Sequence, residues 1–136
     1  MKNLFDIKDK VVVITGGTGV LGRAIALHLA EQGAKVVILG RKAEVGNALV
    51  SEIKAAGGEA LFLTTDVMNR ERLEQNLADI LQAYGRIDAL LNAAGGNMPG
   101  ATIAPTGTFF DLKVEEFQRV LELNLTGTVP VSYTHR

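Results

Sequence analysis

The amino-acid sequence predicts an α/β fold with a doubly wound parallel sheet. Short apolar runs rich in β-branched residues alternate with segments whose apolar residues recur every three or four positions, and glycines separate the two kinds of segment. Such an alternation of strands and helices is typical of right-handed βαβ units, so we expect the strands to be parallel. With 136 residues, 47% hydrophobic and 21% charged, the chain has the composition of one soluble globular domain.

Four strands and four helices are expected in alternation. The strands are predicted at Val11–Thr15, Lys35–Leu39, Ala60–Thr64 and Ile87–Ala93. The first helix carries its apolar face on Leu21, Ala24, Ile25 and Leu29 and ends at Gly33, and the second uses Val45, Leu49 and Ile53 and ends at Gly57–Gly58. The third uses Leu73, Leu77, Ile80 and Leu81 and ends at Gly85, and the fourth uses Val114, Phe117, Leu121 and Leu125.

Two segments interrupt this pattern. Residues Gly95–Phe110 are rich in Gly, Pro and Thr and are expected to form an irregular loop. Residues 130–136 (PVSYTHR) are polar and lose the helical period, so we expect a domain of residues 1–129 and a non-native or truncated tail of residues 130–136. The sheet would then be truncated after about four strands, with the fourth as an uncovered edge.

Composition and charge exclude several classes of function. A formal net charge of −1 gives no electrostatic basis for binding nucleic acid or an anionic membrane. The chain has no cysteine, so it has no disulfide framework or thiolate zinc site, and we expect no metal centre. No apolar run reaches membrane-spanning length, and the first ten residues lack the apolar stretch of a signal peptide. We therefore expect a cytoplasmic protein.

A glycine-rich loop carries the main functional signal. The stretch TGGTGVLG, Thr15–Gly22, follows a predicted strand and opens a predicted helix, which is the context that a G-x-G-x-x-G dinucleotide fingerprint requires. Glycines allow a tight turn and a close approach of backbone to pyrophosphate, while the helix N-terminus offers free N–H groups. The alternative is a tight turn without a ligand. A nucleoside-triphosphatase loop is excluded because the Gly-Lys-Ser/Thr ending is absent.

The chain resembles a short-chain dehydrogenase/reductase of the classical branch, and this resemblance implies a Rossmann fold. It rests on four stretches in the family's order: Thr15–Gly22, Asp66–Val67, Asn92–Gly95 (NAAG) and Asn124–Thr128 (NLTGT). The register of the glycine loop fits the extended branch of the family better, because Val20 stands where classical members carry glycine. The two later stretches favour the classical branch, so we interpret Val20 as a local variant.

The resemblance implies the residues that bind a nicotinamide cofactor. Asp66 and Val67 would contact the adenine, although Asp66 also fits a simple cap after a strand. Asn92–Gly95 would form the floor beneath the ribose. The full set is Gly16, Gly17, Thr18, Gly19, Val20, Leu21, Gly22, Arg41, Asp66, Val67, Asn92, Ala93, Ala94 and Gly95.

The end of the second strand favours NADP over NAD. An acid at this place binds the ribose 2′-hydroxyl of NAD, whereas a nearby arginine accommodates the 2′-phosphate of NADP. Here the acid position is Gly40, and Arg41 and Lys42 follow it. NAD remains the alternative, as does an ordinary solvated basic pair.

The resemblance implies hydride transfer between nicotinamide and a carbonyl or alcohol. Asn124 matches the family's proton-relay asparagine and is the one catalytic residue expected in the chain. The family's serine and Tyr-x-x-x-Lys are not found, since Tyr133 follows Asn124 too closely and Tyr84 fits a packing role. We expect the fragment itself to be inactive.

The substrate is expected to be a small molecule. The loop Gly95–Phe110 should lie over the nicotinamide, and its start, GGNMPGAT, resembles that of sugar-acid reductases of the D-mannonate/fructuronate type. A 3-oxoacyl reductase-like enzyme is one alternative. The others are a non-catalytic nucleotide-binding module and a purely structural domain. We expect the full-length protein to be a homo-oligomer.

Overall fold

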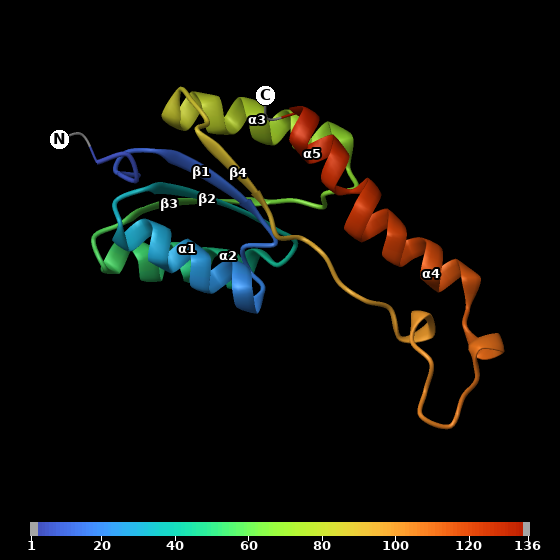
Figure 1. The fold of residues 1–136 in the computed structure, drawn as a ribbon. Coiled ribbons are helices and arrows are strands. Elements are labelled where there is room, and N and C mark those ends of the chain that lie inside the picture. The colour runs from blue at the N-terminus through green and yellow to red at the C-terminus, as the bar shows by residue number, and fades with distance from the viewer. Residues whose placement is uncertain (1–2, 135–136) are drawn as a thin grey trace.

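The computed structural model describes residues 3–134 and contains a four-stranded parallel sheet with helices on both faces (Figure 1). The strands are β1 (Val11–Thr15), β2 (Lys35–Gly40), β3 (Glu59–Thr64) and β4 (Ala89–Asn92), in the order β3-β2-β1-β4. The predicted doubly wound sheet is therefore confirmed. The fourth strand is shorter than predicted, because only Ala89–Asn92 pair with β1.

Helices α1 (Val20–Glu31) and α2 (Ala43–Ala55) cover one face of the sheet, and α3 (Arg70–Tyr84) covers the other (Figure 1). Alternate residues of β1 divide between the two cores: Val12 and Ile14 pack on the side of α1 and α2, while Val11 and Val13 pack with Ile80 of α3. Burial on both faces explains why β1 and β2 are continuously apolar rather than alternating.

The predicted apolar face of the first helix is wrong in part. Leu21 is 76% exposed, and the residues that α1 buries are Gly22, Ala26 and Ala30. These three small residues are four positions apart, so they form a flat stripe on which the helix backbone can approach the sheet closely. A search for large apolar residues misses such a stripe.

The fourth predicted helix is divided into three pieces. Helix α4 (Val114–Leu121) runs into a π-helical turn (Glu122–Thr126), and α5 (Thr128–Thr134) follows. The start of the predicted tail is helical, and Val131 in it is buried against Val67 and Leu73. The non-native origin of residues 130–136 stays a prediction, and residues 135–136 lie outside the described ones.

The loop after β4 and helix α4 form an arm that projects from the body (Figure 1). The loop contains two 3₁₀ turns, Pro99–Ala101 and Phe109–Asp111, and it packs against α4 through the Lys113 N–H, which donates to the Gly100 carbonyl. Residues 99–111 thus pack within the arm, and the expectation that the loop lies over the nicotinamide stays a prediction.

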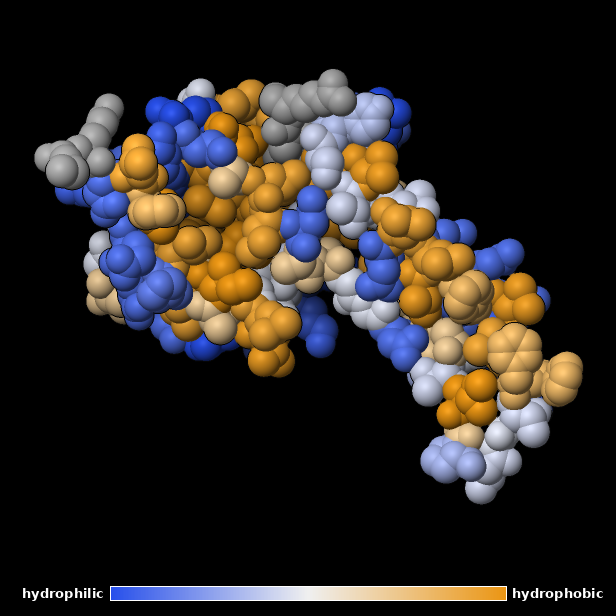
Figure 2. Space-filling view, in the orientation of Figure 1, coloured by the Kyte–Doolittle hydropathy of each residue, from blue (hydrophilic) through white to orange (hydrophobic). Residues whose placement is uncertain are grey.

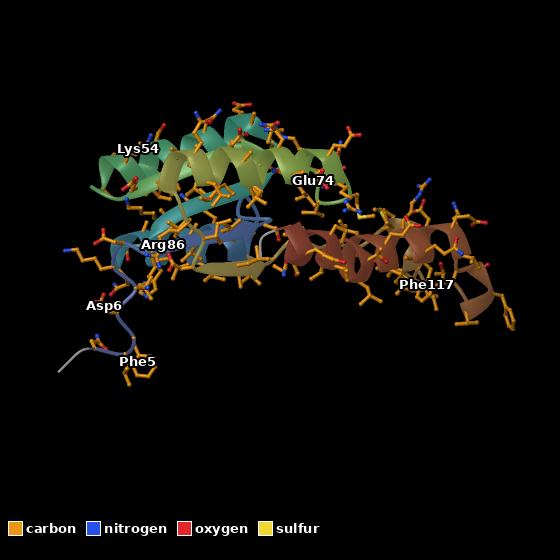
Figure 3. All side chains as sticks on the ribbon, turned by 90° about the horizontal axis from the view of Figure 1, so that it is seen from above. Phe5, Asp6, Lys54, Glu74, Arg86 and Phe117 are labelled. Atoms are coloured by element: carbon orange, nitrogen blue, oxygen red, sulfur yellow. The ribbon has the colours of Figure 1, made fainter. Side chains whose placement is uncertain are left out.

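The arm exposes an apolar stripe (Figure 2). Figure 3 shows Phe117 on α4, well away from the strands. The exposed aliphatic and phenylalanine side chains of this stripe are Val114, Phe117, Leu121, Leu125 and Val129. Within residues 3–134 no helix is both long and apolar enough to cross a lipid bilayer, and no group of His, Cys, Asp and Glu side chains is arranged to hold a metal ion.

Candidate dinucleotide-binding site

A cavity of about 200 Å³ opens at the carboxyl ends of the central strands. The chain proceeds outward from β1 through β2 to β3 and then returns to place β4 on the other side of β1, so the cavity lies at the point where the strand order reverses. Open α/β sheets bind their ligands at this point. The lining residues are Gly16, Thr18, Gly19, Leu39, Gly40, Arg41, Thr65, Asp66, Val67, Ala93, Ala94, Gly95 and Leu123.

The glycine loop is fixed against the end of β4. Gly16 has a φ of +65°, and a Cβ atom added to it would lie 2.5 Å from the Ala93 carbonyl oxygen. The buried Thr15 hydroxyl accepts hydrogen bonds from the N–H groups of Ala93 and Ala94, each at 3.1 Å. The predicted loop and the predicted NAAG stretch therefore form one unit, in which no side chain fits at position 16.

The start of α1 leaves N–H groups for an anion. Gly19 is the N-cap residue and supplies no side-chain cap, and the first turn contains no acidic residue. A Cβ at Gly22 would lie 2.3 Å from the Gly16 carbonyl oxygen, so this glycine lets the helix begin directly against the loop. Unsatisfied N–H groups and the positive end of the helix dipole suit a pyrophosphate.

Two residues of the predicted fingerprint, Val20 and Leu21, do not line the cavity. Val20 is 90% exposed, and Leu21 is exposed beside it on the first turn of α1. The Val20 variant therefore costs nothing in packing, because no neighbour would crowd a side chain at this position. Gly17 does not line the cavity either: its space is limited by Ile38, whose Cγ2 atom would be 2.9 Å from an added Cβ.

The turn after β3 forms the wall expected for the adenine. Val67 is buried. One carboxylate oxygen of Asp66 accepts a hydrogen bond from the Met68 N–H at 3.0 Å, so Asp66 also caps the turn after the strand, which was the alternative role expected for it. Behind this wall lies buried Asn76 of α3, whose side-chain amide donates to the Thr65 hydroxyl at 2.6 Å. Its carbonyl oxygen, Oδ1, has no hydrogen-bond partner among the residues that the structure describes.

A basic side chain borders the opposite end of the cavity. Arg41 lines the cavity directly after Gly40 and, within residues 3–134, makes no hydrogen bond or ion pair. Lys42 is the N-cap residue of α2 and is exposed outside the lining set. The two basic residues therefore differ in position: the Arg41 guanidinium lies at the cavity, and the Lys42 ammonium lies in solvent outside it.

Asn124 is held by the segment that follows β4. Its side-chain amide donates to the carbonyl oxygens of Gly96 (2.7 Å) and Val120 (2.8 Å), and its Oδ1 atom accepts from the Gly96 N–H at 3.1 Å. A Cβ at Gly95 would lie 2.6 Å from this Oδ1 atom. The side chain thus joins the π-helical turn to the cavity floor, and its polar atoms are engaged in doing so.

Asn92 lies away from the cavity, and its amide donates to the Ser132 hydroxyl of α5 at 3.2 Å. The lining residues that were not expected are Leu39, Gly40, Thr65 and Leu123. Leu39 and Gly40 could have been found from the rule that ligands bind at the carboxyl ends of strands. Leu123 could not, because its position depends on the π-helical turn.

Tyr84 has the packing role expected of it. Lys35 lies over its ring at 5.5 Å from the centroid. Burial, and secondarily the negative charge of Glu59, raises the pKa of the Tyr84 hydroxyl above its ordinary value. A base at neutral pH needs the opposite shift, so Tyr84 is not prepared for acid–base chemistry.

Comparison with known proteins defines the family. Residues 10–135 match the model of the short chain dehydrogenase family. The chain belongs to this family. An uncharacterized oxidoreductase of Bacillus subtilis (strain 168), UxuB, is 45% identical over 130 residues, which are 90% of this chain and 47% of that protein. A 3-oxoacyl-[acyl-carrier-protein] reductase of a Synechocystis species is 36% identical over 119 residues, with 87% of this chain and 45% of that protein covered.

A solved structure supports the same relationship. The crystal structure of a "putative D-Mannonate oxidoreductase" from Haemophilus influenza with bound NAD superposes with a TM-score of 0.88 at 30% identity, covering 96% of this chain and 50% of that one. The chain thus spans about half the length of the relatives it matches. That structure and a solved xylitol dehydrogenase hold NAD, whereas a solved actinorhodin polyketide ketoreductase holds NADPH.

The residues of the cavity fit a dinucleotide. Glycine backbone, an uncapped helix start and the free Arg41 guanidinium meet around one space, which is the set of groups that a pyrophosphate and a ribose substituent require. The loop of Gly16, Thr18 and Gly19 would hold the pyrophosphate, the Asp66–Val67 wall the adenine, and Ala93–Gly95 the floor.

Proposed function

We propose that the protein containing this chain is an oxidoreductase that uses NADP(H) to interconvert a carbonyl and an alcohol on a small molecule. The observation that carries this proposal is the glycine-lined cavity at the β1/β4 switch point with the free Arg41 at its rim. When bound, the cofactor supplies the hydride. The residues of this chain bind and orient it.

The preference for NADP over NAD follows from charge at the end of β2. A 2′-phosphate is a dianion that a planar guanidinium can bind with two hydrogen bonds, and Gly40 offers no carboxylate to repel it. The choice between the two cofactors rests on these two residues of the chain itself, since its relatives use both.

Exchange of Arg41 tests this preference. The variant Arg41→Asp should raise the Kd for NADPH by roughly 10- to 100-fold, because a charged hydrogen-bonded pair is lost, while the Kd for NADH stays equal or falls. Lys42→Asp is the matched control, because it makes the same change of charge outside the cavity lining. An unchanged ratio of the two Kd values in Arg41→Asp would overturn the NADP assignment.

The proposed role of Asn124 is to position groups at the nicotinamide end. Its side chain ties the π-helical turn to Gly96, and its backbone carbonyl oxygen accepts a hydrogen bond from the Thr128 hydroxyl at 3.3 Å. Through these bonds Asn124 would hold the cavity floor and the adjoining helix at a fixed separation, as a proton relay between them requires.

For the substrate we propose a sugar acid of the mannonate/fructuronate type, supported by the GGNMPGAT stretch and by the similarity to the D-mannonate oxidoreductase-like structure from Haemophilus influenza. A 3-oxoacyl substrate is the rival, supported by the Synechocystis relative. A turnover panel on the full-length protein separates them. Activity on neither class, together with saturable cofactor binding, would favour a non-catalytic nucleotide-binding module.

We also propose that the full-length protein is a homo-oligomer. The apolar stripe on the arm supports this, because monomers rarely leave a continuous apolar surface in water. Within the cell we propose a cytoplasmic location, where the cofactor is available.

A further inference from the structure

The contact between Thr18 and Gly40 lies at the ribose end of the cavity. Both residues line it, and Arg41 follows Gly40 directly. A Cβ atom added to Gly40 would lie 2.9 Å from the Thr18 Oγ1 atom and 3.0 Å from its Cγ2 atom. The Thr18 side chain therefore occupies the space beside Gly40 and leaves no room for a side chain at position 40.

Neither side of this contact can give way easily. A threonine has three staggered positions on Cβ and fills two of them, and here the two filled positions face Gly40. Any other rotamer leaves at least one of them occupied. On the far side, the Phe62 ring would lie 3.5 Å from a Cβ added to Gly40. This ring packs directly on Gly46, where there is no space for a Cβ, so it cannot move in that direction.

We propose that Thr18 is a specificity-determining residue that excludes an acidic side chain from position 40. Position 40 ends β2, which is where dinucleotide-binding folds place the acid that binds the ribose 2′-hydroxyl and repels a 2′-phosphate. With Thr18 in place this acid does not fit, and Arg41 is the charged group of β2's carboxyl end that reaches the cavity. This inference rests on the proposed function, because it explains how the chain maintains a preference for NADP.

A set of paired variants tests the steric contact without any cofactor. Gly40→Ala should lower the thermal unfolding midpoint, and Gly40→Ala/Thr18→Ala should recover at least half of that loss, because the two side chains compete for one space. Gly46→Ala is the matched control: it crowds the same Phe62 ring from α2, and Thr18→Ala should not rescue it. Equal midpoints for Gly40→Ala with and without Thr18→Ala would overturn the proposal.

Cofactor binding tests the consequence for specificity. In the full-length protein, Gly40→Asp should weaken NADPH and NADH alike by at least about tenfold, because the displaced Thr18 distorts the glycine loop. Adding Thr18→Ala should restore NADH binding at least about tenfold and leave NADPH weak, since the carboxylate then fits and repels the 2′-phosphate. If Gly40→Asp alone binds NADH as tightly as the double variant, Thr18 does not exclude the acid.

The two proposals fail in different ways. An unmodified protein that binds NADH as tightly as NADPH would contradict the NADP assignment, whereas the thermal comparison at positions 18 and 40 would still decide the steric proposal. A Gly40→Asp variant that does not fold is itself expected to be rescued by Thr18→Ala, and a lack of rescue would count against the contact.

Discussion

At the scale of single residues, the site depends on places where a side chain is absent. Gly16 and Gly22 carry no Cβ because the backbone of the loop, of β4 and of α1 converges there to distances of 2.3–2.5 Å from the position of that atom. Thr15 fixes the same junction by accepting two N–H groups of the NAAG stretch. The shape of the glycine loop at the cavity is thus a product of close backbone packing.

The variant Gly16→Ala should destabilise the protein strongly. The backbone at position 16 has a positive φ, which strains any residue that carries a Cβ atom. The added Cβ would also clash with Ala93. Gly85→Ala is the control, because Gly85 has a similar φ of +74° with nothing within 4 Å. Urea unfolding should show a loss of about 1–2 kcal/mol for Gly85→Ala and at least about 1 kcal/mol more for Gly16→Ala. Equal losses of unfolding free energy in the two variants would contradict the steric clash between position 16 and Ala93.

Asn124→Ala should loosen the cavity floor. The change removes the acceptor of the Gly96 N–H, so hydrogen exchange at this amide should quicken by roughly fivefold for the loss of one hydrogen bond. Asn97→Ala serves as the control, since the Asn97 side chain bonds Thr102 and Met98 and leaves Gly96 untouched. An unchanged rate of hydrogen exchange at the Gly96 amide in Asn124→Ala would contradict the proposed hydrogen bond between Asn124 and Gly96.

At the scale of elements, β4 is attached to β1 by a side chain as well as by its backbone. One carboxylate oxygen of Asp88 accepts from the Val11 N–H at 2.9 Å, and the other lies 3.4 Å from the Lys10 ammonium and also bonds the Arg86 guanidinium. The hydrogen bond from Val11 is the largest cause that lowers the pKa of the Asp88 carboxyl below its ordinary value, with Arg86 and Lys10 adding to it.

This lowered pKa makes the stability dependent on pH. The ionised Asp88 stabilises the fold above the pKa of an unfolded aspartate, about 3.9, and the effect is lost as the pH falls from there through the folded pKa. Asp88→Asn should therefore be less stable than the unmodified protein at pH 7, and the difference should shrink below about pH 4. Arg86→Gln, which keeps the Val11 bond, should have the smaller effect at pH 7. A difference for Asp88→Asn that does not change with pH would contradict this role.

The strands were more predictable from sequence than the helix faces. β1 and β2 are buried on both sides, so their apolar runs identify them unambiguously, and the glycines after α2 and α3 mark their ends. The face of α1 was predicted poorly because small residues make its contact. The π-helical turn at Asn124 could not be predicted, since the apolar period continues through it.

At the scale of the whole molecule, the cavity lies at the sheet of the body, while the arm presents apolar surface to solvent (Figure 2). The cavity residues at the ends of the strands could be predicted from the strand order and from the glycine loop. The direction of the arm did not, because it depends on how α4, the π-helical turn and α5 join. That surface is the feature of this chain most suited to contact with another part of the protein or a second copy.

Charges on the arm should change association and leave the body intact. In the full-length protein, the pair Phe117→Glu and Leu121→Glu should reduce the mass measured by light scattering, because two half-exposed apolar side chains of the stripe become charged. The unfolding midpoint of the dissociated protein measures the body separately. Glu115→Lys and Gln118→Glu on the same helix, outside the stripe, provide the control. An unchanged mass in the stripe variant would contradict the proposed oligomer surface.

The central claim is that the cavity at the β1/β4 switch point binds NADPH. An NMR titration of the ¹⁵N-labelled protein with NADPH tests it most directly, since each backbone amide reports its own surroundings. The account predicts saturable shifts concentrated at Thr18, Gly19, Arg41, Asp66 and Val67, with NADH giving weaker binding at the same amides. Absence of saturable shifts, or shifts confined to residues outside the cavity lining, would contradict it.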